Sequence, residues 1–425
     1  MLKFPENFLW GAATSAHQIE GGNNNDWSEW EHANSARLAA EAARRHANAP
    51  TRIPDYIINS RPNPLQRENY ISGKATDHYS RFKKDFDIAK SLGHNCHRLS
   101  VEWSRIEPEE GKFNDKEIEH YRQVILALRE RGIEPFVTLW HWPLPSWLRD
   151  KGGVLSGDFI KYFTRYTERV VLALSTPGVT PGVDFWITVN EPEIYARNSY
   201  LRGVWPPQNK NIFSYISVIN RLIDAHKKAY VAIKKINPES MVGIAQNNQY
   251  IEACQNKFIN RLSKKFLDWW LNFYLLDHIE NHMDFIGLNY YFHTRIDTFK
   301  IKNENKIISD MGWELYPEGI YHVLKDIKKY NKPIYITENG LADAQDKNRK
   351  WFIRETLRNI HGAIKDGVDV RGYMHWSLLD NLELDKGFWP RFGLVEIDYK
   401  TLERKVRPSA YKYAEIIKNN GIDSV

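Results

Sequence analysis

Eight short apolar segments, spaced along the whole of this 425-residue sequence, are the feature that most constrains its fold. They span residues 8–14, 94–101, 133–140, 184–189, 242–247, 284–289, 333–338 and 371–377. Longer stretches with helical periodicity lie between or after them, including 78–93, 115–132, 354–367 and 408–421. The apolar segments are continuous, not alternating, as is typical of parallel strands covered on both faces. The pattern predicts an α/β protein with eight strands, each followed by a helix, in a single (β/α)8 TIM barrel.

A doubly wound open sheet is the competing arrangement. It usually carries a glycine-rich turn after its first strand, and the segment GAATSAHQIEGG at 11–22 does not contain the GxGxxG pattern. We therefore expect one barrel domain over residues 1–425. One stretch interrupts the rhythm, because residues 32–70 hold an alanine-rich helical segment and a proline-containing segment. We expect this stretch to be an insertion between the first strand and its return helix, at the catalytic rim.

Composition excludes several functional classes. The 59 basic and 53 acidic side chains give a net charge of only +6, with no dense block of Lys and Arg, so nucleic acid and membrane partners are not expected. The two cysteines, Cys96 and Cys254, form neither a disulfide framework nor a metal-ligand pair. No segment has the pattern of a signal peptide or the length of a membrane span. We expect a cytoplasmic protein.

The ends of the predicted strands carry polar and aromatic side chains of a restricted kind. They are His17, Gln18, Glu20, Arg98, Glu102, Trp140, His141, Trp142, Asn190, Glu191, Asn247, Asn248, Asn289, Tyr290, Tyr291, Glu338, Asn339, Trp376 and, seven residues further on, Glu383. Polar residues are ordinary where a strand meets a loop. The recurrence of carboxylates, amides and Trp without Lys nevertheless fits a neutral polyol, whose hydroxyls both donate and accept hydrogen bonds. A sugar can also place its apolar face on Trp.

Two glutamates are placed to cleave a glycosidic bond, which requires one protonated and one ionised carboxyl. Glu191 in TVNEP ends the fourth strand and Glu338 in ITENG ends the seventh, so the two can converge across the mouth of the barrel. Burial of Glu338 calls for a partner, and Arg98 and Tyr291 are candidates. Asn289 shares a strand face with Tyr291, which favours Tyr291 over its neighbour. The alternative for Glu338 is a purely structural ion pair with Arg98.

With these motifs the chain resembles glycoside hydrolase family 1, the β-glucosidase/β-galactosidase family of retaining barrels. The resemblance runs from FPENFLWGAATSAHQIEG at 4–21 to FGLVEIDY at 392–399. It implies that Glu191 is the general acid/base and Glu338 the nucleophile. It further implies that Arg98 and Tyr291 orient Glu338 and that a cis peptide bond follows Trp376. It implies no metal or cofactor. The residues implied to bind the glycone are Gln18, His141, Asn190, Trp376 and Glu383, and Trp313 is implied as the aglycone platform.

The sequence departs from the family pattern near the sugar. Leu384 stands where the family usually has Trp, so one indole hydrogen bond is missing or is supplied by another Trp such as Trp389. Glu383 should repel a phosphate dianion and favours a non-phosphorylated sugar, whereas the nearby Lys386 keeps a 6-phospho-β-glycosidase open as an alternative. The expected substrate is a short oligosaccharide or aryl glycoside with terminal β-linked glucose, galactose or fucose. A transglycosylase and a non-catalytic sugar-binding barrel are the remaining alternatives.

Overall fold

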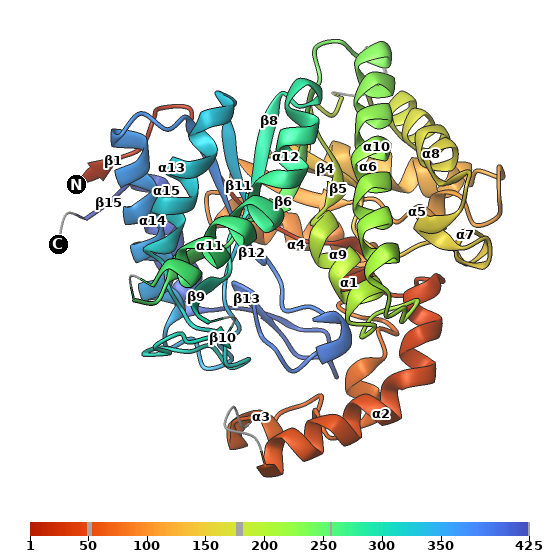
Figure 1. The fold of residues 1–425 in the computed structure, drawn as a ribbon. Coiled ribbons are helices and arrows are strands. Elements are labelled where there is room, and N and C mark those ends of the chain that lie inside the picture. Colours follow the sequence, from red (N-terminus) through yellow and green to blue (C-terminus); the bar gives the residue numbers. More distant parts are fainter. Residues whose placement is uncertain (49–52, 176–181, 256, 299, 424–425) are drawn as a thin grey trace.

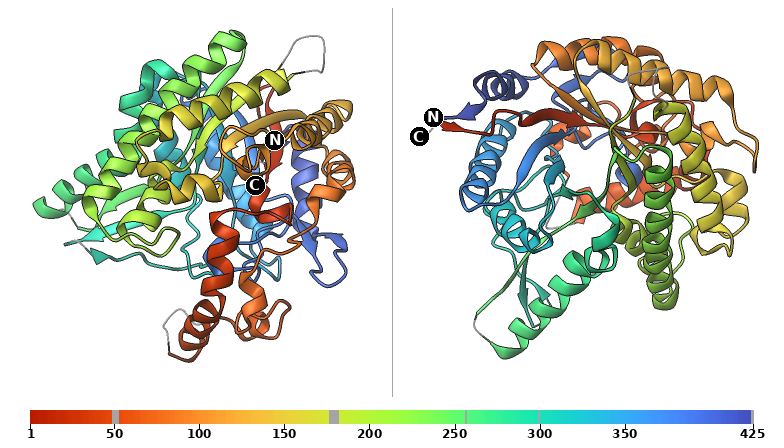
Figure 2. Two further views of the ribbon diagram at one scale, coloured as in Figure 1. Left: turned by 90° about the vertical axis from the view of Figure 1, so that its right-hand side faces the viewer. Right: turned by 90° about the horizontal axis from the view of Figure 1, so that it is seen from above.

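A computed structural model describes residues 1–48, 53–175, 182–255, 257–298 and 300–423 of the chain. Eight parallel strands close into a barrel in the order β11-β12-β2-β3-β4-β5-β6-β8, and β8 pairs with β11 to complete the ring. Helices surround the strands, as Figure 1 and the view from above in Figure 2 show. The predicted (β/α)8 barrel is therefore confirmed.

The barrel strands agree with the predicted segments to within two residues at each end. They are β2 Leu9–Ala13, β3 Cys96–Ser100, β4 Glu134–Trp140, β5 Phe185–Asn190, β6 Met241–Asn247, β8 Phe285–Asn289, β11 Ile334–Asn339 and β12 Val370–Trp376. Nearly every residue in them is buried, because side chains face either the barrel interior or the helices. Shorter strands lie outside the barrel: β1 Leu2–Lys3, β7 Tyr250–Ala253, β9 His293–Asp297, β10 Lys300–Ile301, β13 Val395–Ile397, β14 Arg404–Val406 and β15 Gly421–Ile422.

The helices vary from single turns to seven turns. They are α1 Ala16–Ile19, α2 Asp26–Asn48, α3 Asp55–Ile58, α4 His78–Ser91, α5 Trp103–Ile106, α6 Asp115–Glu130, α7 Ser146–Asp150, α8 Phe159–Ser175, α9 Pro192–Ala196, α10 Ile212–Ile236, α11 Phe258–Leu267, α12 Tyr274–Ile279, α13 Gly319–Ile327, α14 Arg349–Lys365 and α15 Pro408–Asn419. Within the described part of the chain, no helix is both long enough and apolar enough to cross a bilayer.

The predicted start of one helix is wrong. Helix α14 begins at Arg349, five residues before the expected 354. The carboxylate of Asp343, which precedes the helix in an extended loop, accepts the backbone N–H groups of Asn348 at 2.8 Å and Arg349 at 3.0 Å. A helix needs acceptors for the N–H groups of its first turn, and here they come from six residues upstream, outside the usual capping spacing.

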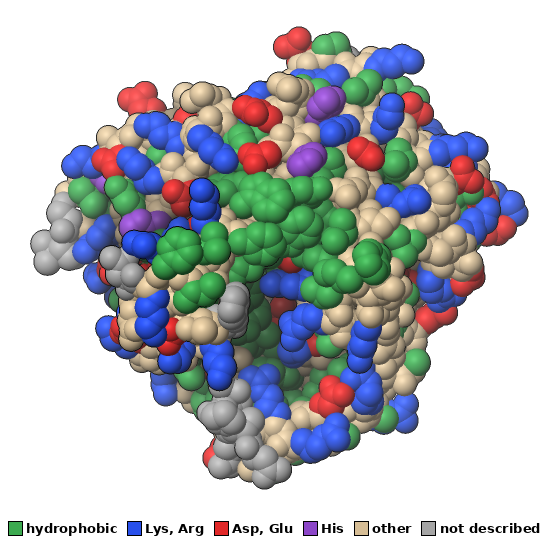
Figure 3. Space-filling view, viewed as in Figure 1, with side chains coloured by type: hydrophobic (Ala, Val, Ile, Leu, Met, Phe, Trp, Pro, Cys, Tyr) green, Lys and Arg blue, Asp and Glu red, His purple; other side chains and the backbone are tan. Residues whose placement is uncertain are grey.

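The helix that enters the predicted insertion, α2, begins at Asp26, because the side chain of Asn25 accepts the backbone N–H of Ser28 at 2.9 Å and caps the helix. Helices α2 and α3 project below the barrel in Figure 1, beneath the hollow visible in Figure 3. Arg45 of α2 donates to the carbonyl of Met311, in the loop before α13, at 2.9 Å. The insertion therefore covers part of the barrel rim.

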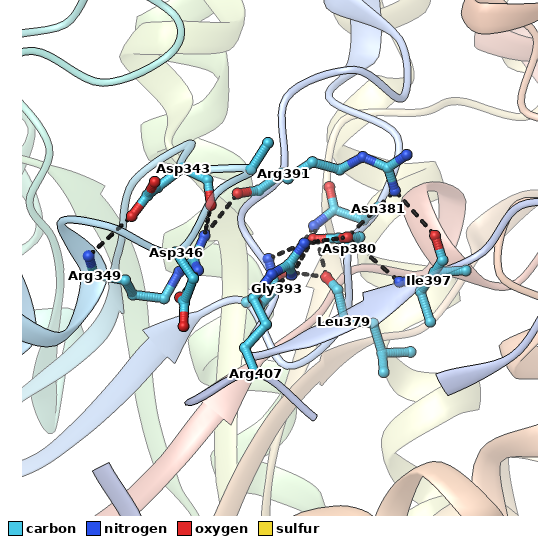
Figure 4. Close-up of polar contacts among 12 residues, drawn as sticks. Asp343, Asp346, Arg349, Leu379, Asp380, Asn381, Arg391, Gly393, Ile397 and Arg407 are labelled. Atoms are coloured by element: carbon cyan, nitrogen blue, oxygen red, sulfur yellow. Dashed lines mark hydrogen bonds and ion pairs between the residues drawn. The ribbon is translucent and has the colours of Figure 1, made fainter. Parts of the chain in front are cut away.

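A buried ion cluster holds the long loop after β12 (Figure 4). Asp380, fully buried, accepts two hydrogen bonds from the guanidinium of Arg407, at 2.8 and 2.9 Å, and one from Arg391 at 3.2 Å. The backbone N–H of Gly393 donates to the same carboxylate at 2.9 Å. Burial raises the pKa of Asp380, but the two guanidinium groups outweigh it, so the pKa lies below its usual value. The cluster ties together residues 380–407 of the loop.

We expect Asp380→Asn to lower the free energy of unfolding by about 3–5 kcal/mol, because it leaves two buried guanidinium groups without their counter-ion. Urea denaturation at pH 7 measures the loss. A depressed pKa contributes stability above the pKa of the unfolded chain, about 4, and this contribution disappears as the pH falls through the folded-state value. The difference between the two proteins should therefore shrink below about pH 4.

Asp369→Asn is the matched control, because Asp369 pairs with Arg371 at 2.8 Å where both side chains are 52% exposed. An exposed pair contributes little, so the change should stay within about 0.5 kcal/mol. Equal effects of the two substitutions would contradict the role given to the buried cluster.

Candidate active site

A cavity of about 660 Å³ opens at the C-terminal ends of the barrel strands and forms the hollow in Figure 3. The predicted residues that line it are Gln18, His141, Glu191, Tyr291, Trp313, Glu338, Trp376 and Glu383. Arg98, Asn190 and Asn289 lie behind its wall, fully buried. Within the described ranges, no group of three or more His, Cys, Asp or Glu side chains is arranged to hold a metal ion. A cavity at this end of a parallel barrel is where barrel enzymes build their active sites.

Glu191 stands where β5 turns into helix α9. Its backbone is left-handed, with φ of 42°, which makes the sharp turn from strand to helix at this residue. The carboxyl is buried, and Oε1 accepts hydrogen bonds from the side-chain amides of Asn247 at 3.0 Å and Asn289 at 2.8 Å. Burial, followed by the nearby charge of Glu338, raises the pKa of Glu191 to about 8. At neutral pH the group is therefore mostly a protonated acid.

Glu338, at the end of β11, has stronger partners. The guanidinium of Arg98 donates to Oε1 in a buried ion pair, and the hydroxyl of Tyr291 donates to Oε2 at 2.9 Å. Burial raises the pKa of Glu338, and the charge of Arg98 and the hydroxyl of Tyr291 oppose the rise. The neighbouring Tyr290 donates elsewhere, to the carbonyl of Tyr316. Of the two carboxyls, Glu338 is the one placed beside a cation and Glu191 the one held by neutral amides.

Arg98 links the two sides of the site. Its other nitrogens donate to the hydroxyl of Thr138 at 3.0 Å and to Oδ1 of Asn190 at 2.6 Å. The amide of Asn190 in turn lies 3.1 Å from Nε2 of His141. Because the Asn190 amide is a donor, Nε2 accepts and the proton of this imidazole sits on Nδ1. Burial, followed by the charge of Arg98, holds the pKa of His141 well below its usual value, so the ring is neutral.

The groups suited to sugar hydroxyls surround the two carboxyls. Nδ1 of His141 is buried and has no partner among the described residues, which leaves a donor available at the cavity wall. The amide of Gln18 donates to Asn381 Oδ1 at 3.0 Å and to the carbonyl of Leu382 at 2.7 Å, so the chain itself fixes its orientation. Asn190, expected to contact the sugar, lies behind the wall between Arg98 and His141.

Trp376 and Trp313, the indoles expected to contact the sugar and the aglycone, line the cavity at different depths. Trp376 ends β12, lies 4% exposed, and is followed by the predicted cis peptide bond to Ser377. Trp313 lies in the loop before α13, with its ring 6.2 Å from that of Tyr291. Gly340 allows the turn after β11 to pack against β12, because a Cβ there would lie 1.8 Å from the carbonyl oxygen of Trp376. The two indoles offer flat surfaces for sugar and aglycone rings.

Trp389, named as one indole that could supply the missing hydrogen bond, is not placed to do so. Trp389 packs in the hydrophobic core and does not line the cavity. Leu384 does line it, and Trp205 is the indole that reaches this corner, where its Nε1 donates to Asp385 at 2.9 Å. Trp205 lies in an irregular loop 180 residues from Asp385, so no local pattern in the sequence could reveal the contact.

Two further residues hold the site, and the sequence pattern gave neither of them a specific role in it. Asn247 donates to Glu191, and Thr138 accepts from Arg98. Asn247 was visible as a polar side chain at a strand end, the same signal that pointed to Asn289. Thr138 lies inside a strand, where a threonine is ordinary and nothing distinguishes it.

Comparisons with known proteins agree with this architecture. The family model described as "Glycosyl hydrolase family 1" matches residues 1–279 and 275–422. A 1,4-beta-D-glucan glucohydrolase from Thermotoga neapolitana is 33% identical, over 99% of this chain and 100% of its own. A beta-galactosidase from Sulfolobus acidocaldarius is 31% identical, over 99% and 96% of the two chains. The chain belongs to glycosyl hydrolase family 1.

Solved structures support the same conclusion. A beta-glycosidase from Pyrococcus horikoshii is similar with a TM-score of 0.85 and 37% identity, over 100% of this chain and 96% of that one. A beta-glucosidase from Thermotoga maritima in complex with glucoimidazole has a TM-score of 0.85 and 30% identity, over 99% and 100% of the chains. The protein is a β-glycosidase of this family of retaining O-glycoside hydrolases.

We expect Tyr291→Phe to lower kcat/KM at least about tenfold, since a hydrogen bond to a charged group contributes about 1.5–3 kcal/mol. Loss of a donor that stabilises the Glu338 carboxylate should raise the pKa of this group. The acid limb of the kcat/KM profile should therefore move to higher pH. Tyr290→Phe is the matched control, because its hydroxyl bonds a backbone carbonyl instead. An unmoved acid limb in Tyr291→Phe would argue against this coupling.

Proposed function

We propose that this protein is a retaining β-glycosidase that removes a terminal, non-reducing β-linked glucose, galactose or fucose from oligosaccharides or aryl glycosides. Glu338 is the nucleophile and Glu191 the general acid/base. The observation that carries the assignment is the difference between their partners. A guanidinium and a phenol hydroxyl stabilise the charged form of Glu338. Burial and the nearby negative charge of Glu338 hold Glu191 as an acid, and they outweigh the two carboxamide donors, which favour its ionised form.

The first step of the reaction follows from these two states. The Glu338 carboxylate attacks the anomeric carbon, and the bond from this carbon to the leaving oxygen breaks. Glu191 gives its proton to that oxygen, so the alcohol leaves neutral and the sugar stays on Glu338 as an ester. The negative charge moves from Glu338 to Glu191, and no cofactor is required.

The second step reverses the role of Glu191. The charge of Glu338 is one cause of the raised pKa of Glu191, and this charge disappears when the ester forms. The pKa of Glu191 then falls, and its carboxylate takes a proton from water as the water oxygen attacks the anomeric carbon. The ester bond breaks, Glu338 regains its charge, and the sugar leaves with its original β configuration.

The cavity favours a sugar without phosphate. Lys386 is the cation nearest in sequence to Glu383, and it forms an ion pair with Asp385, whose other contact is the indole of Trp205. A phosphate dianion would have to displace Asp385 from Lys386 in order to reach this cation. The names of the relatives, a glucan glucohydrolase and a beta-galactosidase, likewise support plain glucose or galactose. A 6-phospho-β-glycosidase remains an outcome that the substrate panel below would reveal.

The two glutamates should respond differently to substitution. Glu338→Gln should reduce turnover by at least about three orders of magnitude on every substrate, since no ester can form.

Glu191→Gln should lower the rate by a factor of about 10²–10⁴ on glycosides with poor leaving groups and far less on nitrophenyl glycosides, whose oxygen needs no proton. In the wild type kcat/KM should fall as the pH rises through about 8, because Glu191 loses its proton, and Glu191→Gln should lack this limb. Equal losses on good and poor leaving groups would contradict the acid role.

A panel of nitrophenyl glycosides tests the function as a whole: β-glucoside, β-galactoside, β-fucoside, β-mannoside, 6-phospho-β-glucoside and an α-glucoside control. We expect release from at least one plain β-glycoside, with the β-anomer as the first product in proton NMR spectra. Release from the phosphorylated substrate alone would identify the 6-phospho enzyme. New disaccharides in place of free sugar would identify a transglycosylase, and binding without release would identify a sugar-binding barrel.

A further inference from the structure

The wall on the leaving-group side of the cavity is built by the chain that follows Glu191. Helix α9 continues into a π-helical turn, Arg197–Leu201, and Ile194, Arg197 and Asn198 line the cavity in succession. At 1.5 Å of rise per residue, Arg197 stands about 9 Å beyond the acid. Since Glu191 marks the glycosidic oxygen in the proposed function, an arginine at this separation suits a group about one ring away from that oxygen.

The guanidinium of Arg197 has little to bind in the protein. It donates no hydrogen bond to any residue in the described ranges, and its buried Nε is without a partner there. The nearest carboxylate is Glu193, 3.5 Å from Nε, and the same oxygen already accepts the hydroxyl of Tyr215 at 3.0 Å. The side chain of Arg197 is 27% exposed, so it is held at the wall but open to the cavity.

Arg202 extends the same wall outward. Its side chain lines the cavity, is exposed, and makes one long contact of 3.4 Å to Asn198 Oδ1. No carboxylate in the described part of the chain lies within 4.0 Å of it. The two arginines therefore place two positive charges, weakly compensated, along the path of the leaving group.

The carboxyls of the cavity are engaged elsewhere. Glu338 is paired with Arg98 and Asp385 with Lys386, while Glu314 accepts from His293 at 2.7 Å and from a backbone N–H at 2.8 Å. Glu191 and Glu383 both have pKa values raised to about 8, by burial first and then by neighbouring carboxylates, and are mostly neutral. Figure 3 shows Lys and Arg side chains gathered around the hollow.

We propose that Arg197 and Arg202 bind an anionic group on the aglycone, so that the substrates include β-glycosides whose leaving group carries a carboxylate, sulfate or phosphate about one ring away from the glycosidic oxygen. A guanidinium suits all three anions because its paired N–H groups match two oxygens. The inference rests on the proposed function, because Glu191 as the acid fixes which end of the cavity receives the leaving group.

The test compares 4-carboxyphenyl and 4-carbamoylphenyl β-glycosides, which differ in charge and scarcely in shape, on the sugar that the panel identifies. We expect kcat/KM to be about tenfold higher for the carboxylate at low salt. The preference should fall several-fold in Arg197→Gln and in Arg202→Gln, and also in 0.5 M NaCl. Lys228→Gln removes one exposed positive charge from α10 outside the cavity and should keep the wild-type preference.

Calorimetric titration of Glu338→Gln with the same two compounds makes the test independent of turnover. Tighter binding of the carboxylate, lost when Arg202→Gln is added, would support the site. Equal binding of the two compounds, or a preference that both arginine variants retain, would overturn it. Absence of turnover on both compounds with normal binding would instead contradict the proposed function, so the two failures are distinguishable.

Discussion

The ion pair between Arg98 and Glu338 is the interaction on which the rest of the site depends. Both groups are buried inside the barrel, where an isolated charge would cost several kcal/mol. Arg98 meets this cost by reaching three other strands at once, through Thr138, Asn190 and Glu338. A closed barrel makes this possible, because only closure brings β3, β4, β5 and β11 within one side chain's reach.

The same pair separates the roles of the two glutamates. A carboxyl beside a guanidinium ionises readily, and its charge then makes it harder for a second buried carboxyl to lose its proton. Among the described residues, Glu191 has amides but no cation as hydrogen-bond partners, so burial and the charge of Glu338 outweigh the groups that favour its ionised form, and the pKa of Glu191 rises. The acid and the nucleophile thus depend on each other, and a change at Arg98 or Tyr291 acts on Glu191 through Glu338.

The barrel strands and most cavity residues could be predicted from the sequence because each follows from a local pattern: a continuous apolar segment and the polar side chain that ends it. Closure of the barrel then places these strand-end side chains around one cavity, regardless of their spacing in the chain. The features that could not be predicted depend on side-chain partners that these local patterns do not specify. The start of α14 is set by Asp343, the orientation of Arg98 by Thr138, and the corner beside Leu384 by Trp205.

The corner beside Leu384 lacks the family's usual indole. Leu384 offers no donor there, and the N–H of Trp205 is already given to Asp385. Glu383 lies beside them with its pKa raised to about 8, by burial first and then by Asp385 and Glu338, so at neutral pH it is mostly a carboxylic acid. An acid both donates and accepts, as a sugar hydroxyl does. We propose that the proton of Glu383 replaces the donor lost at Leu384, and the carboxylates around Glu383 keep that proton in place.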